Sequence, residues 1–222
     1  MPSSEHPLAL LLADAANDTF PDSDGSVEYL PEPDMVAAAL VSFAGRLWVC
    51  GASPERVKGM LRPGAFSDWF GPAACAAIAA EHGVHVGNLD ALLAAPGTGE
   101  GLADAAADPW LVEIEDLDHP RVARSRRYRP EARVFTTADD DGVLLVGRGL
   151  VGRWEVAFEV DPAARGRGLG RRLATAARGL VPAGEPIWAQ VAPANAPSLR
   201  AVLAAGYRVV GAELLFAAEP DQ

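Results

Sequence analysis

The sequence contains few cysteines and no long apolar run. Cys50 and Cys75 are the two cysteines of the 222 residues, and both lie in apolar stretches, RLWVCGA and PAACAAIAA. A buried free cysteine behaves as a small hydrophobic side chain, so we expect a reduced, cytoplasmic compartment. No segment approaches the roughly 20 consecutive apolar residues that a membrane span requires. We therefore expect no membrane role.

The first residues, MPSSEHPLALLLADAAND, also lack a basic residue ahead of their apolar run. Glu5 stands where a signal peptide needs positive charge, so we expect a short amphipathic helix or a tail instead. His82 and His85 are three residues apart, but Gly83 ends the expected helix between them and no other histidine or cysteine is near. A metal site needs more ligands than this, and we expect none.

Basic residues are scarce in the first half. Residues 1–110 hold 4 Lys and Arg against 15 Asp and Glu, whereas residues 111–222 hold 15 of each sign, all the cations being arginine. An acidic half repels nucleic acid and could attract a cationic substrate. Plain solubility is the alternative explanation of that charge.

The composition is that of a folded chain, and turn signals divide it into elements. Within residues 1–110 we expect an α/β domain: a loop over 14–34, a hairpin of 35–43 with 46–52, helices at 53–61 and 71–83, and a strand or short helix at 88–95. Ser53 is the expected cap of the first of these helices, with Pro54 at its first position. Residues 96–109, rich in glycine and proline, are the best candidate for a linker.

Residues 111–222 show a clearer alternation of strands and helices. The expected strands are 110–116, 132–138, 142–151, 153–160, 187–192 and 208–218, and the expected helices are 119–128, 169–180 and 196–206. This order, β-α-β-β-β-α-β-α-β, predicts a mixed sheet with helices, of the α/β (α+β) class.

The stretch EVDPAARGRGLGRRL carries the chemistry. A strand ends at Val160, and RGRGLG then opens a helix whose first amides point outward beside Arg165 and Arg167, an arrangement suited to a pyrophosphate. The spacing differs from a dinucleotide fingerprint because residue 171 is arginine, and no Gly-Lys-Ser/Thr follows as in a P-loop. A plain glycine-rich turn with solvated arginines is the alternative.

Two motifs in this half resemble those of the GNAT superfamily of acetyl-CoA-dependent acyltransferases. The first motif supplies Val160, Pro162, Arg165, Gly168 and Gly170, and the second supplies Asn195, Ser198, Gly206 and Tyr207. The resemblance covers residues 111–222 and implies a mixed, mostly antiparallel sheet flanked by helices. It also implies acetyl-CoA as cosubstrate, bound by Phe158, Val160, Arg165, Gly166, Arg167, Gly168, Leu169, Gly170, Arg171 and Asn195.

The implied reaction is acyl transfer to an amine, which needs a base, an oxyanion donor and, for the leaving thiolate, an acid. A main-chain amide within 158–160 is the implied oxyanion donor. Glu159 and Glu155 are the candidate bases, and either could instead be a solvated or salt-bridged strand residue. Many members of the family carry a tyrosine that protonates the leaving thiolate, and at the matching position this chain has Val202 or its neighbour. Ser198 or water could act as the acid instead. Tyr207 is expected in the core.

This missing tyrosine leaves a second hypothesis open, an acyl-CoA-binding or regulatory module with weak or no catalysis. The acceptor, the acyl chain length and the oligomeric state are not determined by the sequence. The N-terminal half lacks both motifs, but AGRLWVCGASPERVKGML faintly echoes VGRWEVAFEVDPAARGRGL. It could be a degenerate GNAT-like copy, with the role of lining the acceptor side of the site.

Overall fold

The computed structural model describes residues 6–101, 110–115 and 118–218. Their contacts divide the chain into two compact units. The N-terminal unit takes in the chain up to Leu92, the segment Leu150–Gly152 and the chain from Val210; the C-terminal unit takes in Leu93–Gly149 and Arg153–Val209. The predicted boundary at residue 110 is a single cut, whereas these units exchange segments. Over the described ranges, no helix combines the length and apolar character that crossing a membrane requires.

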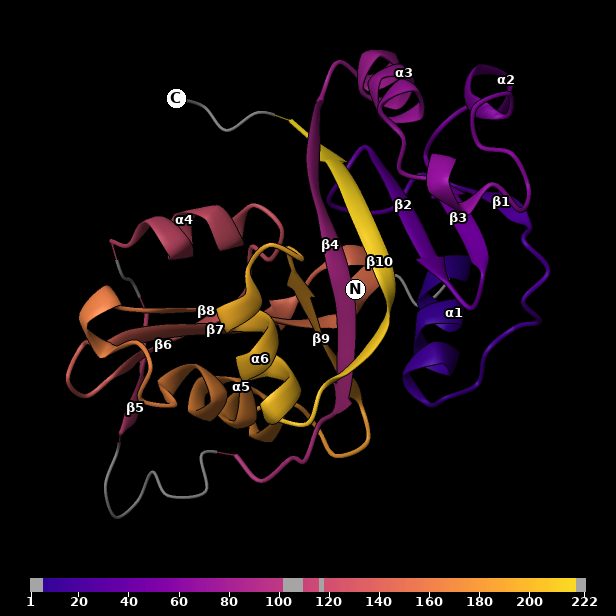
Figure 1. Ribbon diagram of the computed structural model, residues 1–222. Coiled ribbons are helices and arrows are strands. Elements are labelled where there is room, and N and C mark those ends of the chain that lie inside the picture. The colour runs from indigo at the N-terminus through magenta and orange to yellow at the C-terminus, as the bar shows by residue number, and fades with distance from the viewer. Residues whose placement is uncertain (1–5, 102–109, 116–117, 219–222) are drawn as a thin grey trace. The chain divides into compact units, whose positions relative to one another are not determined.

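The N-terminal unit is built on a sheet with the strand order β1-β3-β2-β10-β4 (Figure 1). β2 and β3 form the predicted antiparallel hairpin, β10 pairs antiparallel with β2, and β1 joins β3 in parallel. β10 therefore brings the end of the chain into this sheet. The strands are β1 (Val27–Leu30), β2 (Ala38–Phe43), β3 (Arg46–Cys50), β4 (His85–Pro96) and β10 (Arg208–Ala217).

Turn chemistry explains the hairpin. Ala44 and Gly45 both have positive φ, 49° and 69°, which is the two-residue turn whose twist matches that of the flanking strands. The predicted loop over 14–34 is wrong at two places, because residues 14–16 belong to the helix α1 (Pro7–Ala16) and residues 27–30 form β1. A strand of four residues without alternation gives no local signal, and its pairing with β3 decides its conformation.

The helices of this unit are α1 (Pro7–Ala16), α2 (Pro54–Val57), the 3-10 turn Phe66–Asp68 and α3 (Pro72–His82). α3 ends as predicted at Gly83, which has φ 64° and closes the last turn. Ser53 precedes α2 but makes no side-chain cap bond, since its hydroxyl donates to Glu55. A core of buried apolar residues includes Leu40, Leu47, Val49, Trp69, Ile78 and Phe216.

The C-terminal unit contains the strand order β4-β9-β8-β7-β6-β5, with the last residues of β4 at its edge. Pairing is antiparallel from β5 to β8 and parallel between β8 and β9. The predicted mixed, mostly antiparallel sheet flanked by helices is confirmed. Its further strands are β5 (Leu111–Ile114), β6 (Arg133–Thr137), β7 (Gly142–Arg148), β8 (Trp154–Val160) and β9 (Pro186–Val191).

Helices cover both faces of this sheet. Gly170 of α5 (Leu169–Gly179) packs against Phe158, whereas Ala157 of β8 shares a core cluster with Val122 of α4 (Pro120–Arg126). Adjacent strand residues point to opposite faces, so α4 and α5 lie on opposite sides of β8, as Figure 1 shows. α6 (Ala196–Ala204) packs against α5 and β9.

Two segments of this region differ from the prediction or lie partly outside the described residues. The predicted strand 142–151 stops at Arg148, and the turn Leu150–Gly152 follows, with Val151 at φ 48°. The start of the predicted linker is tied down: the amides of Thr98, Gly99 and Gly101 donate to the carbonyls of residues 178, 181 and 179. Its remainder, 102–109, lies outside the described residues.

Replacing Phe216 with alanine should lower the free energy of unfolding by about 3–5 kcal/mol, because a fully buried aromatic ring loses its contacts and leaves a cavity. Urea denaturation followed by tryptophan fluorescence measures this, since Trp48 and Trp69 are buried in the same unit. The control is Val209→Ala on the same strand, at a residue 58% exposed, with an expected change below about 0.5 kcal/mol. Equal losses in both variants would contradict the place of Phe216 in the core.

Candidate functional site

The candidate site begins where β8 ends. The amide of Asp161 donates to the carbonyl of Asp141 (2.8 Å), and the Asp161 carboxylate accepts from the amide of Ala163 (2.8 Å). This bond caps the short 3-10 turn Pro162–Ala164. The side chain of Arg165 then folds back, its Nε donating to the Val160 carbonyl (3.1 Å). The break predicted at Asp161-Pro162 is thus a compact turn leading from β8 into α5.

Glycine is required here by the backbone. Gly166 and Gly168 have φ of 79° and 85°, and a Cβ on either would meet no atom within 4 Å. Their need is therefore conformational, because other residues rarely adopt positive φ. Gly170 differs: a Cβ there would lie 3.3 Å from the Ala201 Cβ and 3.4 Å from the Phe158 ring. It lets the first turn of α5 approach β8 and α6 closely.

The turn presents main-chain amides that have no main-chain carbonyl as hydrogen-bond partner. In the described parts of the chain, the amides of residues 168–171 donate to no carbonyl; the first bond of the helix is from Arg172 to Gly168 (3.1 Å). Gly168 is the N-cap and provides no side-chain cap, and the first turn contains no acidic residue. Arg165, Arg167 and Arg171 are exposed beside it. Free amides, a helix N-terminus and arginines together suit a diphosphate.

β8 and β9 separate soon after they meet. Their parallel register consists of Trp154↔Ile187 and Glu155↔Trp188, and in the described chain no pairing of these strands continues past it. We call this point, with the unpaired residues that follow on each strand, the fork. In Figure 1 the two strands run in clearly different directions. The edge of β8 beyond Glu155 is therefore open toward β9.

The open edge carries the main-chain groups that the sequence singled out. Because the Asp161 amide points to β7, alternation along the strand turns the amides and carbonyls of Phe158 and Val160 toward the β9 side. The Val160 carbonyl is taken by Arg165. Phe158, which is half-buried, thus offers a donor and an acceptor at the fork. These groups and the glycine turn fit coenzyme A, with the pantetheine arm at the strand edge and the diphosphate at residues 168–171.

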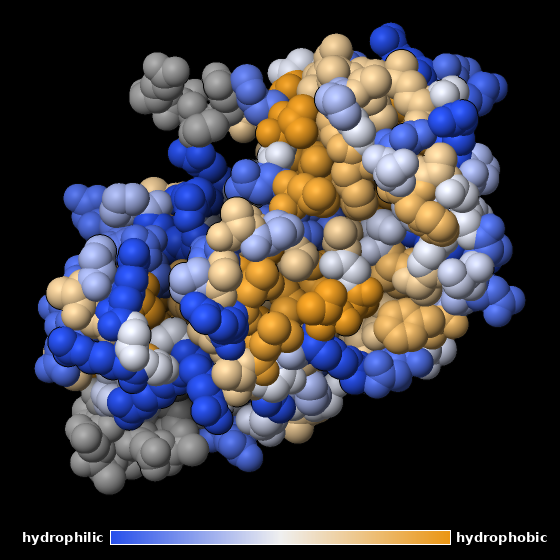
Figure 2. All heavy atoms as spheres, viewed as in Figure 1, coloured by the Kyte–Doolittle hydropathy of each residue, from blue (hydrophilic) through white to orange (hydrophobic). Residues whose placement is uncertain are grey.

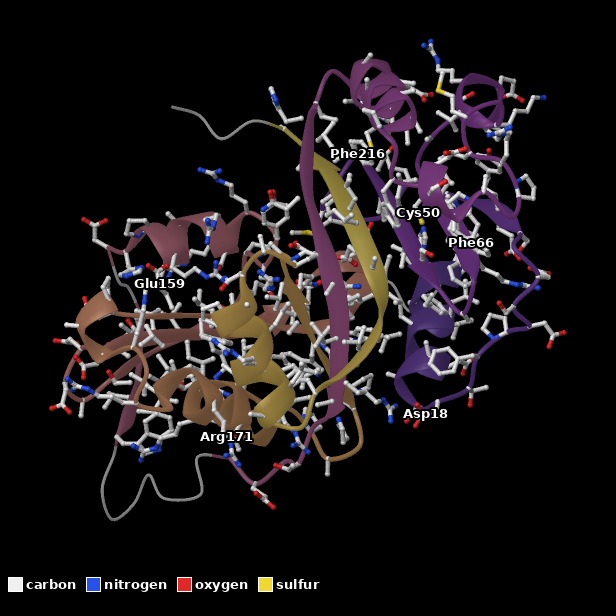
Figure 3. The ribbon with its side chains drawn as sticks, viewed as in Figure 1. Asp18, Cys50, Phe66, Glu159, Arg171 and Phe216 are labelled. Carbon is white, nitrogen blue, oxygen red and sulfur yellow. The ribbon has the colours of Figure 1, made fainter. Side chains whose placement is uncertain are left out.

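The two candidate bases lie on the α4 side of β8 in different surroundings. Glu159 is exposed (Figure 3). Glu155 is 2% exposed and salt-bridged: its Oε2 is 2.5 Å from Arg129 Nη2, and its Oε1 accepts from Arg153 Nε (2.7 Å). Burial alone raises the pKa of Glu155, but the two arginines outweigh it and hold the pKa below its ordinary value. Such a carboxylate is a weak proton acceptor, so the salt-bridged alternative describes Glu155.

The second motif lies at the start of α6. Asn195 is its N-cap, and its Oδ1 accepts from the amide of Ser198 (3.2 Å). Asn195 is exposed and Ser198 is half-buried. Val202, which with its neighbour is where the resemblance implies a tyrosine, is fully buried. Tyr207 is a core residue as predicted: it is 3% exposed, its hydroxyl donates to the Ala174 carbonyl (3.3 Å), and burial raises its pKa well above the ordinary value.

Sequence reasoning did not find Arg129, Arg153 or Gln190. Arg129 Nη2 also lies 3.0 Å from Gln190 Oε1, so these side chains surround Glu155 at the fork. Arg129 belongs to a basic run that reads as a solvated helix, and Gln190 stands alone in an apolar strand. Among the described residues, no cluster of three or more His, Cys, Asp or Glu side chains could hold a metal ion.

The surface around the site is hydrophilic, and charged residues lie on both sides of β8. Hydrophilic residues cover α4 and the region of α5 on the face that Figure 2 shows. Figure 3 places Arg171 on the first turn of α5 and Glu159 on the other side of the strands. The predicted anion-binding turn and the exposed carboxylate thus flank β8 from opposite faces.

Comparison with known proteins identifies the class. Residues 100–207 match the model of the acetyltransferase (GNAT) family. The chain therefore carries a GNAT-family acetyltransferase domain in its C-terminal half, and the family supports an acyltransferase activity. No curated protein matches the sequence.

Several solved structures have limited similarity to the chain. A protein assigned to the GNAT family from Novosphingobium aromaticivorans is 21% identical, with 62% of this chain and 67% of that chain covered and a TM-score of 0.45. GCN5-related N-acetyltransferases from Sphaerobacter thermophilus (13% identity, 64% and 55% covered, TM-score 0.38) and Kribbella flavida (15%, 65% and 64%, 0.38) are also similar. The chain thus spans 55–67% of the length of these structures. The family assignment rests on the family model.

Replacing Glu155 with glutamine should destabilise the fold by about 3–5 kcal/mol at pH 7, because two buried arginines lose their counter-charge. Since the folded-state pKa of Glu155 lies below the unfolded value, the stabilisation is fully present above the unfolded value and is lost as the pH falls through the folded one. The difference between wild type and variant should therefore shrink in acid, below about pH 4.

Denaturant titrations at several pH values measure this difference. Glu113→Gln removes one partner of the exposed pair with Arg133 (2.7 Å) and is the control, with an expected loss below about 1 kcal/mol. A Glu155→Gln variant as stable as wild type at pH 7 would contradict the buried ion-pair arrangement.

Proposed function

We propose that this chain is an acyl-CoA-dependent N-acyltransferase, with acetyl-CoA as cosubstrate, that transfers the acyl group directly to an amine while both substrates are bound. One observation carries the proposal: a single strand, β8, both opens an unpaired edge at the fork and leads into a turn of free amides at residues 168–171. These are the two features that binding a diphosphate with a long, polar thioester arm requires. The family match to residues 100–207 supports the same donor.

Each residue has a role in this proposal. The amides of residues 168–171, with Arg165, Arg167 and Arg171, bind the diphosphate. A main-chain amide on the open edge, that of Phe158 or Val160, donates a hydrogen bond to the thioester carbonyl oxygen, where negative charge develops. Acetyl-CoA supplies the activated acyl group. Asn195 holds the start of α6 in place by capping it.

Glu159 is the proposed base, acting directly or through water on the ammonium group of the acceptor. Glu159 is exposed and forms no salt bridge with the described residues, whereas the Glu155 carboxylate is salt-bridged to two arginines. We propose a cationic amine as the acceptor because residues 1–110 carry 15 acidic against 4 basic side chains, which attracts cations.

A second function is favoured by one observation. The acid is expected at Val202 or its neighbour, but Val202 is fully buried, and Ser198, one turn earlier on α6, is the candidate that could substitute. An acyl-CoA-binding module without turnover would need no acid. Thiol release from acetyl-CoA over a panel of amines separates the two: steady release with any amine supports the enzyme, and tight binding without release supports the module.

Gly168→Trp should abolish the rise in melting temperature that coenzyme A causes in the wild type, because the side chain fills the place of the diphosphate. A ligand that binds only the folded state must raise the midpoint. The matched control is Gly184→Trp, in the loop between α5 and β9: Gly184 also has positive φ, 83°, and open space around it. Backbone strain is then the same in both variants, so an equal response to coenzyme A would remove the assignment of the turn.

Glu159→Gln should lower kcat by about 10²–10⁴-fold, the usual contribution of a general base, with little change in the KM for acetyl-CoA. Initial rates of thiol release with a saturating amine measure this. Glu131→Gln alters another exposed carboxylate, between α4 and β6, and should leave kcat unchanged. A kcat within twofold of wild type in the Glu159 variant, roughly the scatter of such assays, would assign the proton to another group.

A further inference from the structure

Arg129 follows α4 and contacts two strands of the C-terminal unit, β8 and β9, through one guanidinium group. Its own amide donates to the Ser125 carbonyl (2.9 Å), which anchors it to the end of α4. Its Nη2 lies 2.5 Å from Glu155 Oε2 on β8 and 3.0 Å from Gln190 Oε1 on β9. Arg129 is 8% exposed, so these contacts are made away from solvent, where hydrogen bonds and ion pairs are stronger.

The position of these contacts relative to the fork is the important point. Glu155 is the last residue of β8 in register with β9, opposite Trp188. Gln190 comes two residues after Trp188, beyond the end of the pairing, and alternation places it on the same face as Trp188 and Glu155. The guanidinium therefore links β8 at its last paired residue to β9 at a residue that no longer pairs with β8.

Glu155 has further contacts besides Arg129. Its other oxygen accepts from Arg153 Nε (2.7 Å), and Arg153 in turn lies over the ring of Trp188, 5.5 Å from its centroid. A Cβ on Gly149 would overlap the carboxylate, so the glycine leaves room for this side chain and nothing larger. Away from solvent, hydrogen bonds and ion pairs of this kind are electrostatically stronger than in water.

We propose that Arg129, Glu155 and Gln190 are positioning residues that set the course of β9 where it leaves β8, and so prepare the open edge of β8 for the pantetheine arm. The inference rests on the proposed function, and it gives Glu155 a role other than base. The glycine turn lies beyond the opposite end of β8, after Val160. Loosening the network should therefore affect the arm and spare the diphosphate.

The experiment compares two ligands by calorimetry: coenzyme A, and its nucleotide part, adenosine 3′-phosphate 5′-diphosphate, which has no pantetheine arm. Gln190→Met keeps the length of the side chain, Arg129→Met keeps its unbranched stem without the guanidinium group, and both remove the polar link. Both variants should lower the affinity for coenzyme A by about tenfold or more, because a small misplacement of binding groups at a site can reduce its performance by up to about 10²-fold. Their affinity for the nucleotide part should stay within about twofold of wild type, since they leave the turn intact.

Arg133→Met is the matched control, because it removes an arginine from the exposed pair with Glu113, and both affinities should be unchanged. If Arg129→Met does not fold, Gln190→Met decides, since it leaves every charge of the network paired. Equal weakening of both ligands, or of neither, would overturn the positioning role while leaving the proposed function in place. Failure of the wild type to bind either ligand would instead overturn the proposed function.

Discussion

The early end of the pairing between β8 and β9 is the constraint on which the rest of the site depends. If β8 and β9 stayed paired, the backbone of β9 would satisfy the hydrogen-bonding groups of the Phe158 and Val160 main chain. Here the register ends at Glu155 and Trp188, and the amide and carbonyl of Phe158 and the amide of Val160 keep their capacity to bind a ligand. The turn after Val160 does the same at a helix start, because positive φ at Gly166 and Gly168 shapes a loop whose amides remain free.

An open strand edge can bind a ligand, but it also lowers the stability of the fold because its main-chain groups lack hydrogen-bond partners. The buried network around Glu155 lies at the point where that cost begins, with two arginines on its carboxylate and Gln190 held by one of them. Beyond the last paired residues, these side-chain bonds link β8 to β9 where main-chain bonds between the two strands have ended. The same network explains the glycine at 149, because a Cβ there would overlap the Glu155 carboxylate.

Local signals in the sequence predicted local structure well. The Ala44-Gly45 hairpin turn, the end of α3 at Gly83 and the glycine turn before α5 each depend on backbone conformations that residue type alone indicates. The position of Tyr207 in the core followed from the same kind of reasoning. These features are decided within a few residues.

The sequence failed where distant segments decide the structure. β1 is a strand because β3 lies beside it, and β10 leaves the half of the chain that contains it to join β2. Glu155 and Glu159 are both glutamates on the same face of β8, yet Glu155 is buried between arginines and Glu159 is exposed. No spacing in the sequence distinguishes them, because Arg129 and Gln190 reach Glu155 only through the fold.

The central claim is that main-chain amides of the turn and of the open strand edge bind coenzyme A. The most direct measurement is an NMR titration of the ¹⁵N-labelled protein with coenzyme A, following each amide resonance. We predict that the amides of residues 168–171 and of Phe158 shift together, with one common dissociation constant. Saturable shifts confined to other parts of the chain, with these resonances unmoved, would contradict the account.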